Sequence, residues 1–195
     1  MKTEKNRSLT ENRLISAIEQ LIIEKGFEKL GINAVAEKAG VDKKLIYRYF
    51  SSLDGLIYEC LKRNDFWMNI PADTPELPEL KEYAKKMFRD QIKHLRENRI
   101  LNRLARWELS NNRDIVTEIR QKREEKGLDR LATVDGLTDL TTKELAAILA
   151  VITAGITYLA ILEENCRYYN DINIQTDNGW EELAKGIDKI IDSLI

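Results

Sequence analysis

Near residue 45 the chain carries a cluster of side chains of the kinds that bind nucleic acids. They are Lys43, Lys44, Tyr47 and Arg48. These positions are spaced i, i+1, i+4 and i+5, so a helix would place them on one face. Ile46 and Phe50 would lie on the opposite side and pack inward. Ammonium, guanidinium and phenol groups donate hydrogen bonds to phosphate oxygens and to base edges. The pattern therefore predicts a DNA contact, and its alternative is a solvated charged face on an ordinary helical hairpin.

The residues before this face supply the elements that would position it. The segment 32–39 predicts a short helix whose small apolar side chains allow close packing. Gly40 can adopt the left-handed conformation that ends a helix. Asp42 is a good N-cap for a second helix over 43–50. Two short helices joined by such a turn form a helix-turn-helix, whose second helix can enter the major groove of DNA. This context favours the DNA contact over the solvated hairpin.

From about Leu9 to Lys62 the chain resembles the DNA-binding domain of the tetracycline-repressor (TetR) family of bacterial transcription regulators. The matching segments are EKGF (24–27) after an amphipathic first helix, VAEKAGVDKKLIYRYF (35–50), and LDGLIYECL (53–61) at the start of a fourth helix. The helix lengths, the glycine positions and the Tyr-x-x-Phe ending agree together. The remainder matches only as an all-helical pattern of the expected length. The resemblance implies that Leu45 and Tyr49 join the four outward residues in contacting DNA.

Three positions depart from the family pattern. Gly31 stands where a Ser or Thr often caps the second helix, which weakens the cap by only a few tenths of a kcal/mol. Lys44 and Leu45 replace a small residue and a Thr in the recognition helix, which suggests a different operator, with Leu45 near a thymine methyl group. Leu53 replaces a Lys and removes one expected phosphate contact. None of these changes affects the predicted fold.

The charge of the chain is divided unevenly along its length. The net charge of its 195 residues is −2, yet residues 1–64 hold 12 Lys or Arg against 9 Asp or Glu. This asymmetry fits a DNA-binding head on an acidic body. Lys2, Lys5 and Arg7 form a basic N-terminal segment that either lies along DNA or is disordered. The start of the chain is polar and shows no signal peptide.

The hydrophobic periodicity predicts an all-α fold of about nine helices. The expected helices span 10–25, 32–39, 43–50, 53–68, 76–97, 100–109, 114–131, 142–168 and 179–194. Ser52 is expected to cap the fourth of these helices, and Thr141 or Thr142 the eighth. We expect a DNA-binding domain over 1–52, a connecting helix over 53–70, and an effector-binding and dimerisation domain over 71–195.

The segment 145–162 has no charged residue, which brings it to the lower length limit of a membrane span. Five alanines, a glycine and two threonines make it only mildly hydrophobic, and charged residues flank it closely. A wholly buried helix of a soluble bundle explains it better. The predicted location is therefore the cytoplasm, without membrane contact.

Cys60 and Cys166 lack metal-ligand spacing and are expected to be free thiols.

The last two predicted helices carry stripes suited to a partner helix. Small side chains repeat every four residues in the first, which allows close approach of two helix axes. The second has a broad apolar stripe. The residues predicted to form the interface are Ala146, Ala150, Ala154, Trp180, Leu183, Ile187 and Ile191. Two such helices from each of two chains would form a four-helix interface, and the family resemblance implies the same dimer. The alternative is packing within one chain.

The resemblance also implies an internal cavity among the fifth to eighth helices that holds a small-molecule effector. Candidate residues are Tyr83, Met87, Gln91, His94, Trp107, Glu108, Thr157 and Tyr158. Each of them is also compatible with ordinary core or surface packing. Among them, Glu108 shares a face with apolar residues, where a carboxylate is costly, and pairing with Arg103 or Arg106 would relieve that cost.

Together these patterns predict a DNA-binding transcriptional regulator, a repressor released from a palindromic operator by a small molecule. We expect no catalytic residues, metal or cofactor, because the sequence has no phosphate-binding glycine loop, no metal-spaced cluster and a single histidine. An enzyme is thus a weak rival. A helical adaptor that does not bind specific DNA is the stronger one.

Overall fold

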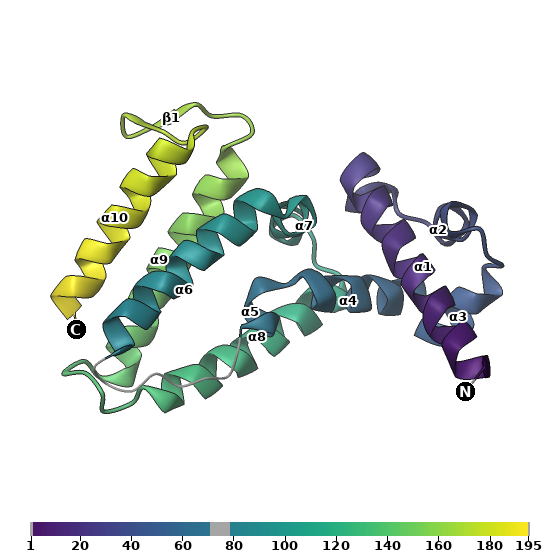
Figure 1. Cartoon of the computed structure of the whole chain (residues 1–195), viewed down its shortest axis with the longest axis horizontal. Helices are drawn as coiled ribbons and strands as arrows, with labels where there is room; N and C mark the ends of the chain where they lie inside the picture. The colour runs from purple at the N-terminus through teal and green to yellow at the C-terminus, as the bar shows by residue number, and fades with distance from the viewer. Residues whose placement is uncertain (1, 71–78, 195) are drawn as a thin grey trace. The chain divides into compact units, whose positions relative to one another are not determined.

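The computed structural model describes residues 2–70 and 79–194. Within these ranges it contains ten α-helices, one 3-10 helix and a single two-stranded sheet (Figure 1). The predicted all-α class is confirmed. The chain forms two compact units: unit 1 holds 1–69 and 99–121, and unit 2 holds 70–98 and 122–195. Residues 99–121, which follow the first segment of unit 2, therefore pack with the N-terminal segment.

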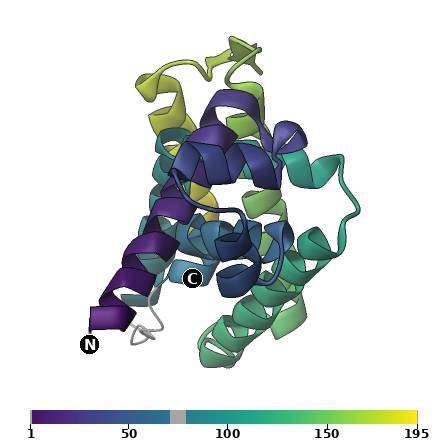
Figure 2. The same ribbon diagram turned by 90° about the vertical axis from the view of Figure 1, so that its right-hand side faces the viewer.

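Unit 1 is built from short helices around the long first helix. Its elements are α1 (Lys2–Lys25), the 3-10 helix η1 (Phe27–Lys29), α2 (Ile32–Ala39), α3 (Lys44–Phe50), α4 (Leu53–Asn64), α5 (Phe66–Asn69), α7 (Arg99–Leu109) and the first part of α8 (Asp114–Thr133). Helix α1 contacts α2, α4 and α7, and α3 packs against α4. Figure 2 shows α1 running past α2 and α3.

The core of unit 1 forms on the apolar face of α1, which the sequence predicts to be amphipathic. Leu14, Ile18 and Ile22 are fully buried. Phe27 stacks on Trp107, with ring centroids 4.7 Å apart, and thereby joins η1 to α7. Arg113, which follows α7, forms an ion pair with Asp54 in the first turn of α4. The segment 99–121 is thus anchored to the N-terminal helices by both aromatic and ionic contacts.

Two helix boundaries in unit 1 differ from the predictions. The first helix begins at Lys2 rather than at residue 10, and the Thr10 hydroxyl donates to the Asn6 carbonyl (2.9 Å) within it. The fourth helix ends at Asn64 because Asp65 adopts an extended conformation and its carboxylate accepts from the Met68 amide (3.0 Å). This bond starts the separate helix α5, which brings the count to ten rather than nine.

Unit 2 is organised around α6 (Leu80–Glu97), which contacts both α9 (Thr142–Leu162) and α10 (Asp177–Leu194). Thr141 begins α9 with a full capping box, in which its hydroxyl and the Glu144 carboxylate each bind the other's backbone amide. Of the two threonines considered, Thr141 is therefore the cap. The part of the predicted fifth helix (76–97) before Glu79 lies outside the described residues.

Arginines of α6 bind carboxylates of unit 2. Arg89 donates to Glu181 (2.8 Å) and to Asp188 (2.6 Å), both on α10. Arg96 donates to Glu163 (2.9 Å) and to Asp177 (2.8 Å). Hydrogen bonds with Arg89 lower the pKa of Glu181. Because water still reaches these half-buried or exposed groups, we assign each pair modest stabilisation and a larger part in fixing the position of α6 against its neighbours.

Helix α9 is not wholly buried, which corrects the prediction. Within the chain only Leu145, Ile152, Ile156 and Ala160 of this helix are buried. Its opposite face is exposed and almost entirely apolar: Ala147, Ala150, Val151, Ala154, Gly155 and Tyr158. By length and composition alone the helix could cross a membrane. Of the residues in its most apolar stretch, 22% are buried inside the structure. One such helix is weak evidence for a membrane span, since an apolar face can also be covered by protein.

The predicted eighth helix also ends earlier than expected, at Leu162 rather than near Tyr168. A short hairpin follows, formed by β1 (Tyr168–Tyr169) and β2 (Ile172–Asn173). Its two turn residues, Asn170 and Asp171, have φ values of 48° and 65°. Left-handed conformations at both central positions are typical of a type I′ hairpin turn, and Asn and Asp tolerate them better than most residues.

Both cysteines are free thiols, as predicted. Cys60 lies in the core of unit 1, and burial raises the pKa of its thiol to about 12. It therefore stays protonated and unreactive at neutral pH. Cys166 is half-buried in the segment after α9.

Candidate nucleic-acid interface

Helix α3 has one buried and one exposed face. Ile46 is fully buried. Lys43, Lys44, Tyr47 and Arg48 are all exposed, with Tyr47 at 53%. Leu45 and Tyr49 are half-buried at the margins of this face. We call the six residues 43–45 and 47–49 the α3 face. Its position matches what the sequence predicts, and its contacts with DNA remain a prediction.

The turn before α3 is fixed by backbone geometry. Gly40 ends α2 in the left-handed conformation, with φ of 62°. The Val41 amide then donates to the Ala36 carbonyl (3.0 Å). The Asp42 carboxylate accepts from the Lys44 amide (2.8 Å), so this residue caps the start of α3 as expected, although Lys43 occupies the formal N-cap position.

Arg13 braces the same turn from α1. Its guanidinium donates to the carbonyls of Ala39 (2.7 Å) and Gly40 (3.3 Å). Those carbonyls end α2 and would otherwise face solvent. Sequence analysis missed this contact because it joins residues 26 positions apart. Arg13 thus ties the C-terminal end of α2 to α1.

The joint between α3 and α4 is tight. The Ser52 hydroxyl accepts from the Gly55 amide (3.0 Å), which confirms Ser52 as the cap of α4. A Cβ atom at Gly55 would lie 2.0 Å from the carbonyl oxygen of Phe50. Only glycine therefore fits at this position. This close approach of Gly55 to the Phe50 carbonyl fixes the angle between α3 and α4.

Arg7 of α1 lies beside the α3 face. Its guanidinium carbon is 5.3 Å from the centre of the Tyr49 ring, within cation–π range. Its Nε donates to Glu11 (2.8 Å), and this hydrogen bond raises the pKa of Arg7. The side chain is 60% exposed. Arg7 thus extends the cationic surface beyond α3.

The predicted effector residues fall in both units. Trp107 and Glu108 are buried in unit 1, where the Glu108 carbonyl accepts from Arg120. In unit 2, Gln91 is 1% exposed, and neither of its side-chain polar atoms has a hydrogen-bond partner among the described residues. Tyr83, Met87, His94 and Thr157 are half-buried. Tyr158 lies on the exposed face of α9, edge-on to Tyr169.

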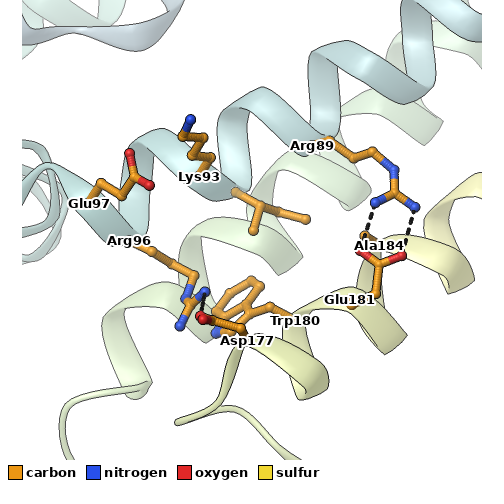
Figure 3. A pocket seen from close by; sticks show the side chains of 9 residues that line it. Arg89, Lys93, Arg96, Glu97, Asp177, Trp180, Glu181 and Ala184 are labelled. Atoms are coloured by element: carbon orange, nitrogen blue, oxygen red, sulfur yellow. Dashed lines mark hydrogen bonds and ion pairs between the residues drawn. The ribbon is translucent and has the colours of Figure 1, made fainter.

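A groove of about 190 Å³ lies between α6 and α10 (Figure 3). Ile92, Trp180 and Ala184 form its apolar part, and the paired Arg89 and Arg96 lie along it. None of the predicted effector residues lines it. Because both arginines already bind carboxylates, this groove is a packing seam rather than a site with uncompensated positive charge.

The predicted dimer residues divide between buried and accessible positions. Trp180 and Ile191 are buried within the chain, and the Trp180 ring nitrogen donates to the Ile174 carbonyl (2.8 Å). Ala150 and Ala154 are exposed, and Ala146, Leu183 and Ile187 are half-buried. The accessible members lie on the outer sides of α9 and α10.

Within the described residues no group of three or more His, Cys, Asp or Glu side chains is arranged to hold a metal.

Residues 14–60 match the family model described as bacterial regulatory proteins, tetR family. This range contains the helix-turn-helix and the whole α3 face. No curated protein is similar enough in sequence to count as a relative.

Several solved structures share the fold over nearly the whole chain. NalD, the secondary repressor of the MexAB-OprM multidrug efflux pump in Pseudomonas aeruginosa, is 14% identical, with a TM-score of 0.61 over 93% of this chain and 97% of that one. A TetR-like transcriptional regulator from Rhodococcus sp. RHA1 is 16% identical, with a TM-score of 0.59 over 93% of each chain. HlyIIR, a hemolysin II transcriptional regulator, is 16% identical, with a TM-score of 0.55 over 96% of this chain and 98% of that one.

The family match covers the DNA-binding helices, and the structural similarity extends the same all-α fold through the rest of the chain. Residues 14–60 thus match the tetR family of bacterial regulatory proteins, and the chain shares its all-α fold with solved transcriptional regulators.

Proposed function

We propose that the protein is a homodimeric repressor that binds a near-palindromic operator through the α3 face and is released by a small-molecule effector. Residues 1–52 bind DNA, 53–70 connect, and 71–195 bind the effector and dimerise. The observation that carries the proposal is the one-sided α3: four exposed basic or phenolic side chains opposite a fully buried Ile46. This arrangement suits insertion into a major groove.

A second copy of the chain supplies the second recognition helix. One α3 contacts only a few base pairs, too few to specify a genomic site. Regulators of this family dimerise on DNA operators. The exposed apolar face of α9 supports a dimer, because Val151 is 73% exposed beside a row of alanines and would be covered by a partner helix. Covered in this way, α9 needs no membrane, and the protein acts in the cytoplasm.

Gln91 is the residue of the predicted effector set with the clearest reason to meet a ligand. An amide buried without hydrogen bonds costs about 1–3 kcal/mol. A small molecule that offers both a donor and an acceptor would satisfy it. A ligand that binds more tightly to a dimer conformation whose two α3 helices are wrongly spaced for the operator would lower operator occupancy. NalD is a repressor, which supports repression here.

The alternative function is a helical adaptor that uses the α3 face only for solubility. Selection of binding sites from a randomised duplex pool by the full-length protein separates the two. The expected result is enrichment of an inverted repeat with half-sites about one helical turn (roughly 34 Å) apart. Lys44→Ala should weaken the enrichment, while replacing Lys126, an exposed lysine of α8, by Ala should leave it unchanged. A pool that stays random after selection with the wild-type protein would refute the proposed function.

A further inference from the structure

The exposed apolar face of α9 ends at a pair of tyrosines. Its outermost residues recur every three or four positions, at 147, 150, 151, 154, 155 and 158, so they form one continuous stripe along the helix. Tyr158 is the last of them and is 51% exposed. The ring of Tyr169, from the hairpin that follows α9, packs edge-on against it, with ring centroids 6.2 Å apart. The hairpin therefore lengthens the stripe beyond the end of the helix.

The hairpin is held firmly against α10. Ile174, directly after β2, is fully buried, and its carbonyl accepts from the ring nitrogen of Trp180 (2.8 Å). A Cβ atom at Gly179 would lie 2.0 Å from the Asn173 carbonyl oxygen, so the end of β2 lies directly against the first turn of α10. Figure 1 shows the hairpin at the ends of α9 and α10. Tyr169 is thus presented in a fixed position, which lowers the entropy cost of using it in a contact.

The two tyrosines of β1 lie on different surfaces. Successive side chains of a strand point to opposite faces, so Tyr168 lies on the other side of the hairpin from Tyr169. There the guanidinium carbon of Arg167 is 5.3 Å from the centre of the Tyr168 ring. Tyr169 instead joins the α9 stripe and remains 39% exposed. Accessible tyrosine rings on a preformed surface are typical of protein interfaces, because they bury much area with few rotatable bonds.

The chemistry of this surface fits a second copy of the chain. In a twofold dimer the same patch meets itself, so a patch of one charge sign would repel its own copy. The stripe over 147–158 has no charged residue, and the hydroxyl of each tyrosine can both donate and accept a hydrogen bond. An anionic membrane fits less well, because the segment 163–171 holds three acids against one arginine.

We propose that Tyr158 and Tyr169 form an aromatic contact with the second copy of the chain, which extends the dimer interface from α9 onto the hairpin. This inference rests on the proposed homodimer and adds to it a contact outside the helices α9 and α10. The tyrosine pair supplies buried aromatic area next to a stripe of small side chains, so it carries a large share of the dimer affinity.

Sedimentation equilibrium of the full-length protein measures the dimer dissociation constant. Tyr169→Ala should raise this constant at least about tenfold, because a buried aromatic contact is lost. Tyr169→Phe keeps the ring and should stay close to the wild type. Tyr168→Ala is the matched control on the other face of the hairpin, and its dissociation constant should remain within about twofold of the wild-type value.

A crosslinking measurement tests proximity without depending on the stability of an alanine variant. Tyr169 is replaced by the photocrosslinker p-benzoylphenylalanine, and the purified full-length protein is irradiated. A covalent dimer should appear on a denaturing gel. The same replacement at Tyr168 should give far less of it, because that side chain lies on the other side of the hairpin.

An unchanged dissociation constant in Tyr169→Ala, or a dimer that forms no crosslink from position 169, would overturn the inference and leave the α9 interface and the proposed function intact. Equal losses in Tyr169→Ala and Tyr168→Ala would also overturn it, since the hairpin would then act only through its fold. A monomeric wild type would refute the proposed homodimer itself. Binding of such a monomer to phosphatidylglycerol vesicles, lost in Tyr169→Ala, would assign the surface to a membrane instead.

Discussion

The exposed residues of α3 are expected to divide their roles according to their chemistry. Lys44→Ala should cost about 1–3 kcal/mol of binding to the selected duplex and blur the sequence preference, because a base contact is lost. Tyr47→Phe should weaken the selected and scrambled duplexes alike if its hydroxyl donates to a phosphate. Anisotropy titrations against both duplexes check this, and unchanged binding in both variants would contradict the assignment of the α3 face.

Replacing Gln91 by Leu should raise the stability of the protein and abolish its release from DNA by an effector. Gln91→Leu removes an amide that is buried without hydrogen-bond partners among the described residues, so the free energy of unfolding should rise by about 1–3 kcal/mol. The variant should no longer be released from DNA by compounds that release the wild type. Urea unfolding measures the first effect, with Gln121→Leu on the exposed side of α8 as the control. A less stable Gln91→Leu variant would show that the amide supports the fold.

The position of some side chains could be predicted from the sequence, and the contacts of others could not. The outward positions of Lys44 and Tyr47 follow from helical periodicity, because Ile46 fixes which side is buried. The brace made by Arg13 could not be predicted, since an arginine in a polar stretch gives no sign of which distant carbonyls it will reach. Arg7 was recognised as basic, but its position against Tyr49 depends on how α1 crosses the helix-turn-helix.

Between elements, the joint from α3 to α4 is the most constrained contact of the candidate interface. Gly55→Ala would place a methyl group 2.0 Å from the Phe50 carbonyl oxygen, so the backbone must shift. We expect a loss of about 1–3 kcal/mol in stability together with weaker DNA binding. Gly127→Ala is the matched control: a Cβ there meets nothing within 4 Å, and greater helix propensity should stabilise α8 by up to about 1 kcal/mol. Equal stability of the two variants in urea would contradict the tight joint.

Hydrophobic periodicity located some helix ends well and missed others. The stripe of α1 and the bounds of α2 were predicted closely, because each shows a clear apolar pattern next to a glycine. The end of α9 was not, because the residues after Leu162 remain compatible with a helix in composition. The hairpin forms instead through two left-handed residues, Asn170 and Asp171. Local turn chemistry therefore overrode the helical pattern.

For the whole molecule, the exposed face of α9 leads to a prediction about assembly. Ala150→Glu and Ala154→Glu each place a carboxylate where the proposed partner helix would lie, and burying an unpaired charge is costly. Both variants should sediment as monomers at micromolar concentration and bind the selected duplex at least tenfold more weakly. Ala132→Glu, at an exposed position of α8, should remain dimeric. A dimer that survives both α9 changes would exclude this face as the interface.

The sequence by itself determined the helix-turn-helix, its outward basic face and the cap at Ser52, and it narrowed the cap of α9 to Thr141 or Thr142. These features depend on short-range spacing: a side chain three or four residues away, a glycine that permits a turn, or a hydroxyl that accepts from a nearby amide. They could be predicted because the interacting groups are close neighbours in the chain.

Only the tertiary structure decided which side of α9 stays exposed, that Trp107 stacks on Phe27, and that residues 99–121 pack with the N-terminal unit. Each of these outcomes depends on the choice among several apolar surfaces of similar composition. A uniformly apolar helix such as α9 carries no polar side to mark its outer face, so its burial is set by how many neighbours the fold can bring to it. Long-range packing, rather than local pattern, therefore fixed the surfaces available to a partner and to a ligand.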